Sequence, residues 1–172
     1  YKLRMVSAHN SSLKDKRKMA PGKELRGKLE ATVDIHVSAK KFYDALAKTA
    51  NALPDALELV HGIDLQKGEW HKHGAIKSWT YTTFDGIKET FVERQEHDDK
   101  NMTMTMVCLA GNIMDVCKSY KITYVCLPHD NSPKVHVTID YELRTAANEP
   151  PKKYLPLLVK LVHEVDSHIA EW

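Results

Sequence analysis

The chain has 172 residues, of which 42% are hydrophobic and 28% charged, and its formal net charge at pH 7 is +2. This length fits one domain, which can bury roughly two-thirds of the surface exposed by the unfolded chain. No run of about 18 apolar residues is present, and the first residues lack the pattern of a secretory signal, so we expect neither a membrane span nor secretion.

Positive charge is concentrated near the N-terminus. The first 26 residues carry a net charge of +6, so the remaining residues carry −4. A mildly acidic body does not favour binding to nucleic acid. The string KDKRK at 14–18 could be a localisation or phosphate-binding patch, but Met19-Ala-Pro resembles a start site. We therefore expect residues 1–26 to be a basic extension, flexible or foreign to the native chain, and residues 27–172 to form the folded domain.

The cysteines indicate a reducing compartment. Cys108, Cys117 and Cys126 form an odd set without CxxC spacing, which argues against a disulfide framework and against a zinc knuckle. Reduced thiols in the cytoplasm are the simplest interpretation.

A half-buried strand is predicted from Gly27, because apolar and polar residues alternate between Leu29 and Ile35. Ser38 then fits the N-cap of a helix that continues to about residue 53, with apolar residues at helical spacing. Pro54 interrupts this helix and favours a second, short one.

Six further strands follow in close succession. Short segments rich in Gly, Asp, Asn and Pro separate them, which is typical of an antiparallel meander. The predicted strands are 60–67, 76–83, 87–97, 102–110, 120–127 and 135–143.

The last segment, residues 150–172, is predicted to be a long amphipathic helix that covers the sheet. Pro156 falls near its first turns, where it is tolerated or produces a small kink. The apolar stripe consists of Tyr154, Leu158, Leu161, Val165 and Ile169.

Several local strings occur in an order that resembles the plant major latex proteins, a branch of the Bet v I (birch pollen allergen, pathogenesis-related class ten) superfamily. The resemblance covers residues 27–172. Two positions depart from it, because Ala110 stands where that branch has glutamate and Asn112 where it has aspartate. The matching strings are Gly68-Glu69-Trp70, Gly74, Ile76-Lys77, Trp79, Leu109 to Met114, Lys118 to Lys121, Tyr141-Glu142, Asn148-Glu149, Pro151, Tyr154-Leu155 and Glu164 to His168.

The resemblance implies an α+β helix-grip fold, in which a seven-stranded curved antiparallel sheet, two short helices and a long C-terminal helix enclose a hydrophobic cavity. It also implies ligand binding and, in some relatives, catalysis on plant alkaloids. Residues 27–172 would then be a ligand-binding domain.

Strand alternation predicts which side chains face the interior. The methionines suit an adaptable ligand-binding surface, or alternatively they only fill a core. Lys77 shares the parity of Trp79 and Tyr81, so it either faces a partly polar cavity with a lowered pKa or reaches solvent at the strand end. The candidate ligand-binding residues are Lys77, Trp79, Tyr81, Met104, Met106, Cys108, Tyr120, Tyr124, Ile139, Tyr141, Tyr154 and Leu158.

Two functions compete, and a third ranks last. The first is a binder or carrier of a small hydrophobic or aromatic plant metabolite, working as a monomer or weak homodimer without a cofactor. The second is an isomerase or condensing enzyme of alkaloid metabolism, with Lys77, Tyr81 and Tyr141 as catalytic candidates. Ribonuclease activity ranks last, because no suitable pair of histidines or of histidine and lysine is evident. No metal is expected, since His71 and His73 lack further ligands at metal-binding spacing.

Overall fold

The computed structural model describes residues 4–10, 24–49, 51 and 53–172. Its strands form one antiparallel sheet in the order β1-β2-β8-β7-β6-β5-β4-β3. The elements are β1 (Arg4–Asn10), β2 (Arg26–Asp34), α1 (Ala39–Lys48), the 3-10 turn η3 (Pro54–Ala56), β3 (Val60–Lys67), β4 (Ile76–Thr82), β5 (Lys88–Asp98), β6 (Thr103–Gly111), the 3-10 turn η4 (Asn112–Asp115), β7 (Cys117–Leu127), β8 (Lys134–Leu143) and α2 (Tyr154–Ile169).

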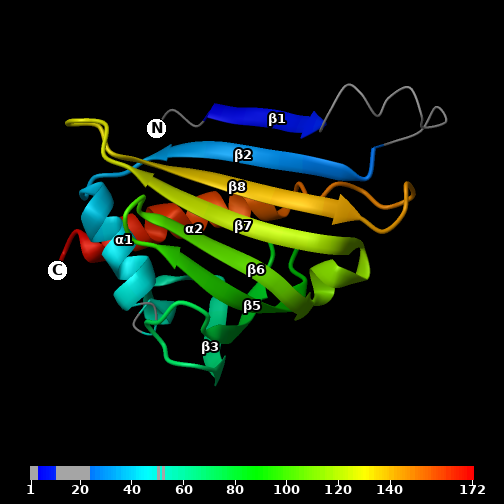
Figure 1. The fold of residues 1–172 in the computed structure, drawn as a ribbon, viewed down its shortest axis with the longest axis horizontal. Coiled ribbons are helices and arrows are strands. Elements are labelled where there is room, and N and C mark those ends of the chain that lie inside the picture. The colour runs from blue at the N-terminus through cyan, green and yellow to red at the C-terminus, as the bar shows by residue number, and fades with distance from the viewer. Residues whose placement is uncertain (1–3, 11–23, 50, 52) are drawn as a thin grey trace.

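The predicted fold class is confirmed. Strands β2 to β8 are the seven expected strands, and α2 lies across one face of the sheet (Figure 1). An eighth strand, β1, comes from the segment expected to be an extension, and it pairs with β2 at the edge of the sheet with Arg4 opposite Thr32. No helix among the described residues is long and apolar enough to cross a membrane.

Helix α1 begins as predicted and ends earlier than predicted. The Ser38 hydroxyl oxygen accepts a 3.1 Å hydrogen bond from the Lys41 amide, which caps the first turn. The helix ends at Lys48, because Thr49 leaves the helical conformation and its hydroxyl donates to the Ala45 carbonyl. A β-branched residue that bonds back to the preceding turn favours such an end over continuation to residue 53.

The turn between β6 and β7 depends on one glycine. Gly111 has φ of +128°, and a Cβ atom there would overlap the carbonyl oxygen of Thr90 on β5. The following Asn112 accepts a 2.9 Å hydrogen bond from the Thr90 amide. Asn112 therefore holds the turn against β5 with its amide oxygen.

A buried carboxylate fixes α2 to the other end of the sheet. Asp166 accepts hydrogen bonds from the backbone amides of His36 and Val37 at 3.0 and 3.1 Å, and from the His36 ring at 2.8 Å. These amides lie between β2 and α1, so one side chain connects all three elements. Pro156 falls at the third position of α2, where the missing amide has no helical partner to lose.

Candidate functional site

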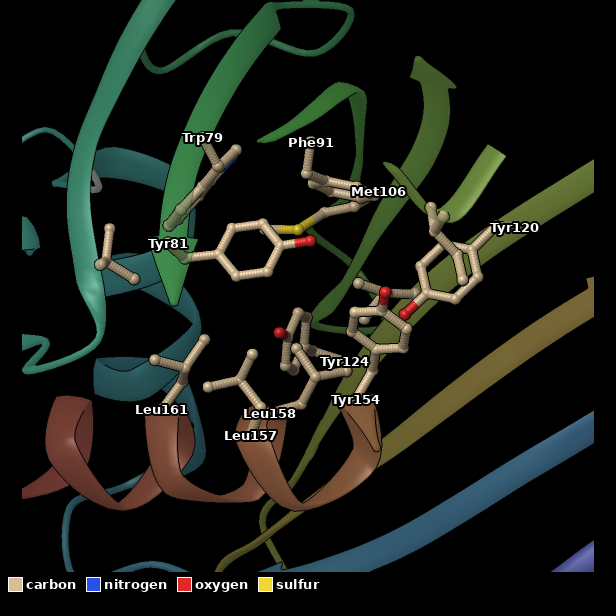
Figure 2. Close-up of a pocket in the computed structure, with 13 residues that line it drawn as sticks. Trp79, Tyr81, Phe91, Met106, Tyr120, Tyr124, Tyr154, Leu157, Leu158 and Leu161 are labelled. Atoms are coloured by element: carbon tan, nitrogen blue, oxygen red, sulfur yellow. The ribbon is translucent and has the colours of Figure 1, made fainter. Parts of the chain in front are cut away.

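An apolar cavity lies between the inner face of strands β3 to β7 and helix α2. Its volume is about 60 Å³. Figure 2 shows aromatic rings from the sheet facing leucines from the helix. The lining residues are Val60, Trp79, Tyr81, Phe91, Met106, Ile113, Tyr120, Ile122, Tyr124, Tyr154, Leu157, Leu158 and Leu161.

The cavity is small because aromatic side chains fill much of the interior. The rings of Phe91 and Tyr154 each pack edge-on against that of Tyr120, with centroids 6.0 Å apart in both pairs. Pockets that enclose drug-sized molecules usually measure roughly 300–1,000 Å³. A ligand of metabolite size therefore requires these side chains to move, and the thioether of Met106 is the lining group that adapts most easily.

Seven of the twelve predicted ligand-binding residues line the cavity: Trp79, Tyr81, Met106, Tyr120, Tyr124, Tyr154 and Leu158. The other five do not. Met104 and Ile139 are fully buried in the core, and the Tyr141 ring packs over Gly27, so its hydroxyl is not directed into the cavity. The Cys108 thiol donates to the Ala110 carbonyl.

Lys77 is the fifth predicted residue that does not line the cavity, and it lies inside the protein. None of its surface is exposed, so the alternative in which it reaches solvent is wrong. Its ammonium donates a 3.0 Å hydrogen bond to Gln95 and lies 5.2 Å from the centre of the Trp70 ring. Burial lowers the pKa of Lys77, although the nearby Glu93 acts in the opposite direction.

Glu93, which the sequence analysis did not select, lies directly across from Lys77 in the β4–β5 pairing. It is also fully buried. Its Oε1 atom accepts hydrogen bonds from the Trp79 indole at 3.1 Å and from the Gln95 amide at 2.9 Å. Burial raises the pKa of Glu93 to about 7, against the lowering effect of these hydrogen bonds and of Lys77.

A second buried carboxyl group joins the sheet to the start of α2. Glu89 Oε1 accepts from the hydroxyls of Tyr81 at 3.2 Å and Tyr154 at 2.7 Å, and its Oε2 accepts from Lys153 at 2.9 Å. Both tyrosines line the cavity. Burial and the adjacent carboxylate raise the pKa of each tyrosine, so both hydroxyls stay protonated as donors to Glu89.

The two glutamates share one face of β5, and a sequence signal for this exists. Phe91 is the apolar residue of β5 that faces inward. Glu89, Glu93 and Gln95 lie at alternate positions along the strand from it, so their side chains face inward too. Carboxyl groups flanking an inward phenylalanine at alternate positions indicate a polar interior. The prediction treated this strand only as part of the meander, so it missed them.

No group of three or more potential metal ligands occurs among the residues that the structure describes. The ring nitrogen of His73 accepts a 3.0 Å hydrogen bond from the His97 amide. The three cysteines are buried and free, and burial raises the pKa of the Cys126 thiol to about 12. A protonated thiol in an apolar strand is a poor nucleophile.

Comparisons with known proteins agree with this architecture. The family model described as the pathogenesis-related protein Bet v 1 family matches residues 24–171. MLP-like protein 329 of Arabidopsis thaliana is 34% identical over 141 residues, which cover 81% of this chain and 93% of that protein.

Solved structures share the fold. The crystal structure of major latex-like protein 151 from Panax ginseng superposes with a TM-score of 0.80 at 23% identity, covering 84% of this chain and 97% of that one. A Thalictrum norcoclaurine synthase mutant with a bound transition-state analogue superposes with a TM-score of 0.68 at 15% identity, covering 87% and 97%. At these identities the similarity shows the fold alone.

Proposed function

The chain belongs to the pathogenesis-related protein Bet v 1 family, and from this premise we propose that it binds a small hydrophobic plant metabolite between its sheet and helix α2, as a carrier, storage or defence-related protein. The observation that carries the proposal is the cavity lining, in which tyrosine, tryptophan and phenylalanine rings from the sheet face leucines of α2. Burial of a ligand's apolar surface there would supply affinity at about 25 cal/mol per Å².

Binding requires the cavity to enlarge. Tyr120, Tyr154 and Met106 occupy the space that a larger guest would take. Rotation of these side chains costs less than opening a sheet, since it breaks no backbone hydrogen bonds. We expect enlargement without a change of fold.

The test is a titration of the full chain with flavonoids, steroids and benzylisoquinolines, followed by native mass spectrometry. Saturable one-to-one binding with recovery of unchanged ligand supports a carrier. Replacing Leu158 by tryptophan fills the cavity and should abolish that binding, whereas Leu109→Trp, at an exposed position on β6, should not. Equal binding by both variants would contradict the proposal.

Catalysis is a second candidate, favoured by the buried Lys77 and Glu93 pair. Burial lowers the pKa of Lys77 and raises that of Glu93 to about 7, and shifts of this kind are typical of groups that act in acid–base catalysis. Among the tyrosines proposed as acids, Tyr81 lines the cavity and Tyr141 does not. A product that forms from an amine and an aldehyde with the wild type, and not with Lys77→Ala, would favour the enzyme.

We also propose that the protein acts in the cytoplasm. The three cysteines are free and buried, which is the expected state in a reducing compartment. Fractionation of plant tissue with an antibody to the chain tests this location, and recovery in the apoplast would contradict it.

A further inference from the structure

Two of the buried carboxyl groups, Glu89 and Glu93, lie on the inner face of β5, and they differ in how fully their oxygens are hydrogen-bonded. Both oxygens of Glu89 accept hydrogen bonds, from two tyrosine hydroxyls and one lysine. Glu93 accepts two hydrogen bonds at Oε1, whereas its buried Oε2 has no hydrogen-bond partner among the described residues. Buried polar atoms are almost always paired, so an exception needs an explanation.

Oε2 needs a different kind of partner in each protonation state of Glu93. In the carboxylate, this oxygen has no donor. In the acid, the proton belongs on Oε2, because Oε1 already accepts from Trp79 and Gln95, and the resulting O–H needs an acceptor. The group that satisfies both states must donate and accept hydrogen bonds, which is the property of a hydroxyl.

The Glu93 carboxyl lies next to the cavity wall. It accepts a hydrogen bond from the indole of Trp79, and Trp79 lines the cavity. Its charge also raises the pKa of Tyr124, another lining residue, although burial is the larger cause. On β6 its partner in the register is Cys108, and the next inward residue there is the lining Met106. A shift of the Met106 side chain, with the Trp79 indole still bonded to Oε1, would extend the cavity toward this carboxyl.

Each of the two buried glutamates has a lysine near it without a ligand. Glu93 faces Lys77 across the β4–β5 pair, and Glu89 bonds to Lys153, which the exposed Asp85 shares. A charged ligand would leave one buried charge without compensation, which is strongly unfavourable. The charge balance therefore favours an uncharged guest.

We propose that the ligand is an uncharged, mainly apolar molecule with a hydroxyl group, which hydrogen-bonds Glu93 Oε2 while its hydrocarbon part packs on Trp79, Phe91 and Met106. This inference rests on the proposed ligand-binding function and specifies the chemical class of the ligand. Glu93 is then the residue that selects for the hydroxyl.

Four probes that share one ring system separate a preference for a hydroxyl from a preference for an apolar, acidic or basic ligand. They are naphthalene, 2-naphthol, 2-naphthoic acid and 2-naphthylmethylamine, each titrated calorimetrically into the full chain at pH 7. We expect 2-naphthol to bind about tenfold more tightly than naphthalene, as one hydrogen bond to a charged group allows. The acid and the amine should bind more weakly than 2-naphthol. Equal affinities of 2-naphthol and naphthalene, or a tighter acid or amine, would overturn the inference and leave the proposed function standing.

The binding of none of the four probes would instead count against the proposed function itself. In Glu93→Leu the preference for 2-naphthol should disappear while naphthalene still binds, whereas Glu93→Gln, which keeps a donor and an acceptor, should retain most of it. Glu96→Gln is the matched control, because Glu96 lies on the outer side of the same strand.

A second measurement uses the wild-type chain, so it does not depend on whether a variant folds. The ¹³C resonance of the Glu93 carboxyl should move during titration with 2-naphthol and stay nearly constant with naphthalene. A carboxyl resonance that responds equally to both probes would show that the hydroxyl does not reach Glu93, and the inference would fail.

Discussion

Glu93 is the residue whose titration should be visible in the stability of the protein. Its pKa is about 7 in the folded chain, above the ordinary value of 4.5 for a glutamate, so the folded state holds its proton more tightly than the unfolded state. Stability from this group is therefore present at pH 4 and is lost as pH rises from about 4.5 through about 7. The loss should be on the order of 3 kcal/mol between pH 4.5 and pH 8.

Urea unfolding of the wild type and of Glu93→Gln at several pH values measures this pH-dependent contribution of Glu93 to stability. The difference between their free energies of unfolding should shift in favour of the glutamine variant as pH rises. A difference that does not change with pH would contradict the raised pKa.

The charge of Lys77 should hold the pKa of Glu93 down. Its coulombic effect opposes the rise caused by burial, so Lys77→Met should move the pKa of Glu93 above about 7. Carboxyl ¹³C NMR across a pH series gives the value directly. Lys88→Met, at an exposed site on the same strand as Glu93, should leave it unchanged. The interaction is absent if both variants give the wild-type pKa.

Asp166 is a residue on which the attachment of α2 depends. Asp166→Ala would leave the backbone amides of His36 and Val37 without their acceptor, so we expect a loss of about 2–4 kcal/mol of unfolding free energy. Asp64→Ala, at an exposed position on β3, should change stability by less than about 0.5 kcal/mol. Similar losses in both variants, measured by urea unfolding, would argue against this role.

At the scale of elements, the contact between the β4–β5 hairpin and α2 depends on Glu89. The hydroxyls of Tyr81 and Tyr154 share one of its oxygens, so they form a small network in which the two bonds are coupled. Each single change to phenylalanine should cost about 1–2 kcal/mol. The double variant should depart from additivity by at least about 0.5 kcal/mol. Strict additivity in the double-mutant cycle would mean that the two hydroxyls act independently.

The β6–β7 turn tests the requirement for glycine. Gly111→Ala combines a positive φ with overlap on Thr90, so it should destabilise the protein by several kcal/mol. Gly74→Ala, where φ is also positive and the space is open, should cost only about 1 kcal/mol. Thermal unfolding compares them, and equal losses would mean that the overlap is relieved by small shifts.

The order of the elements could be predicted because it depends on local signals. Alternation marked β8, Ser38 marked the start of α1, and spaced apolar residues marked α2. The end of α1 was harder, since a single threonine competes with helix propensity over only a few residues.

The candidate site could be predicted only in part. The parity of Lys77 with Trp79 and Tyr81 places all three on one face, and the structure agrees. Parity does not separate cavity from core, which is why Met104 and Ile139 were selected beside residues that line the cavity. The cavity volume depends on how the tyrosine rings pack across the interior, and no local pattern encodes that.

At the scale of the whole molecule, a ligand in the interior should stabilise the fold by mass action. Because the guest would contact β4, β5, β7 and α2 together, it binds the folded chain and not the unfolded one. At a free concentration of about 100 times Kd the gain should be about 2.7 kcal/mol. Thermal unfolding with rising 2-naphthol should show a steady increase in Tm, and a Tm that does not respond would contradict interior binding.

The most direct test is where a bound guest lies. With ¹³C-methyl-labelled methionine and saturating 2-naphthol, we predict nuclear Overhauser effects between the naphthalene ring protons and the Met106 methyl group, which lines the cavity. Met114, in η4 and outside the cavity lining, should show none. Saturable binding with contacts to Met114 alone would place the ligand outside the space between sheet and helix and contradict the account.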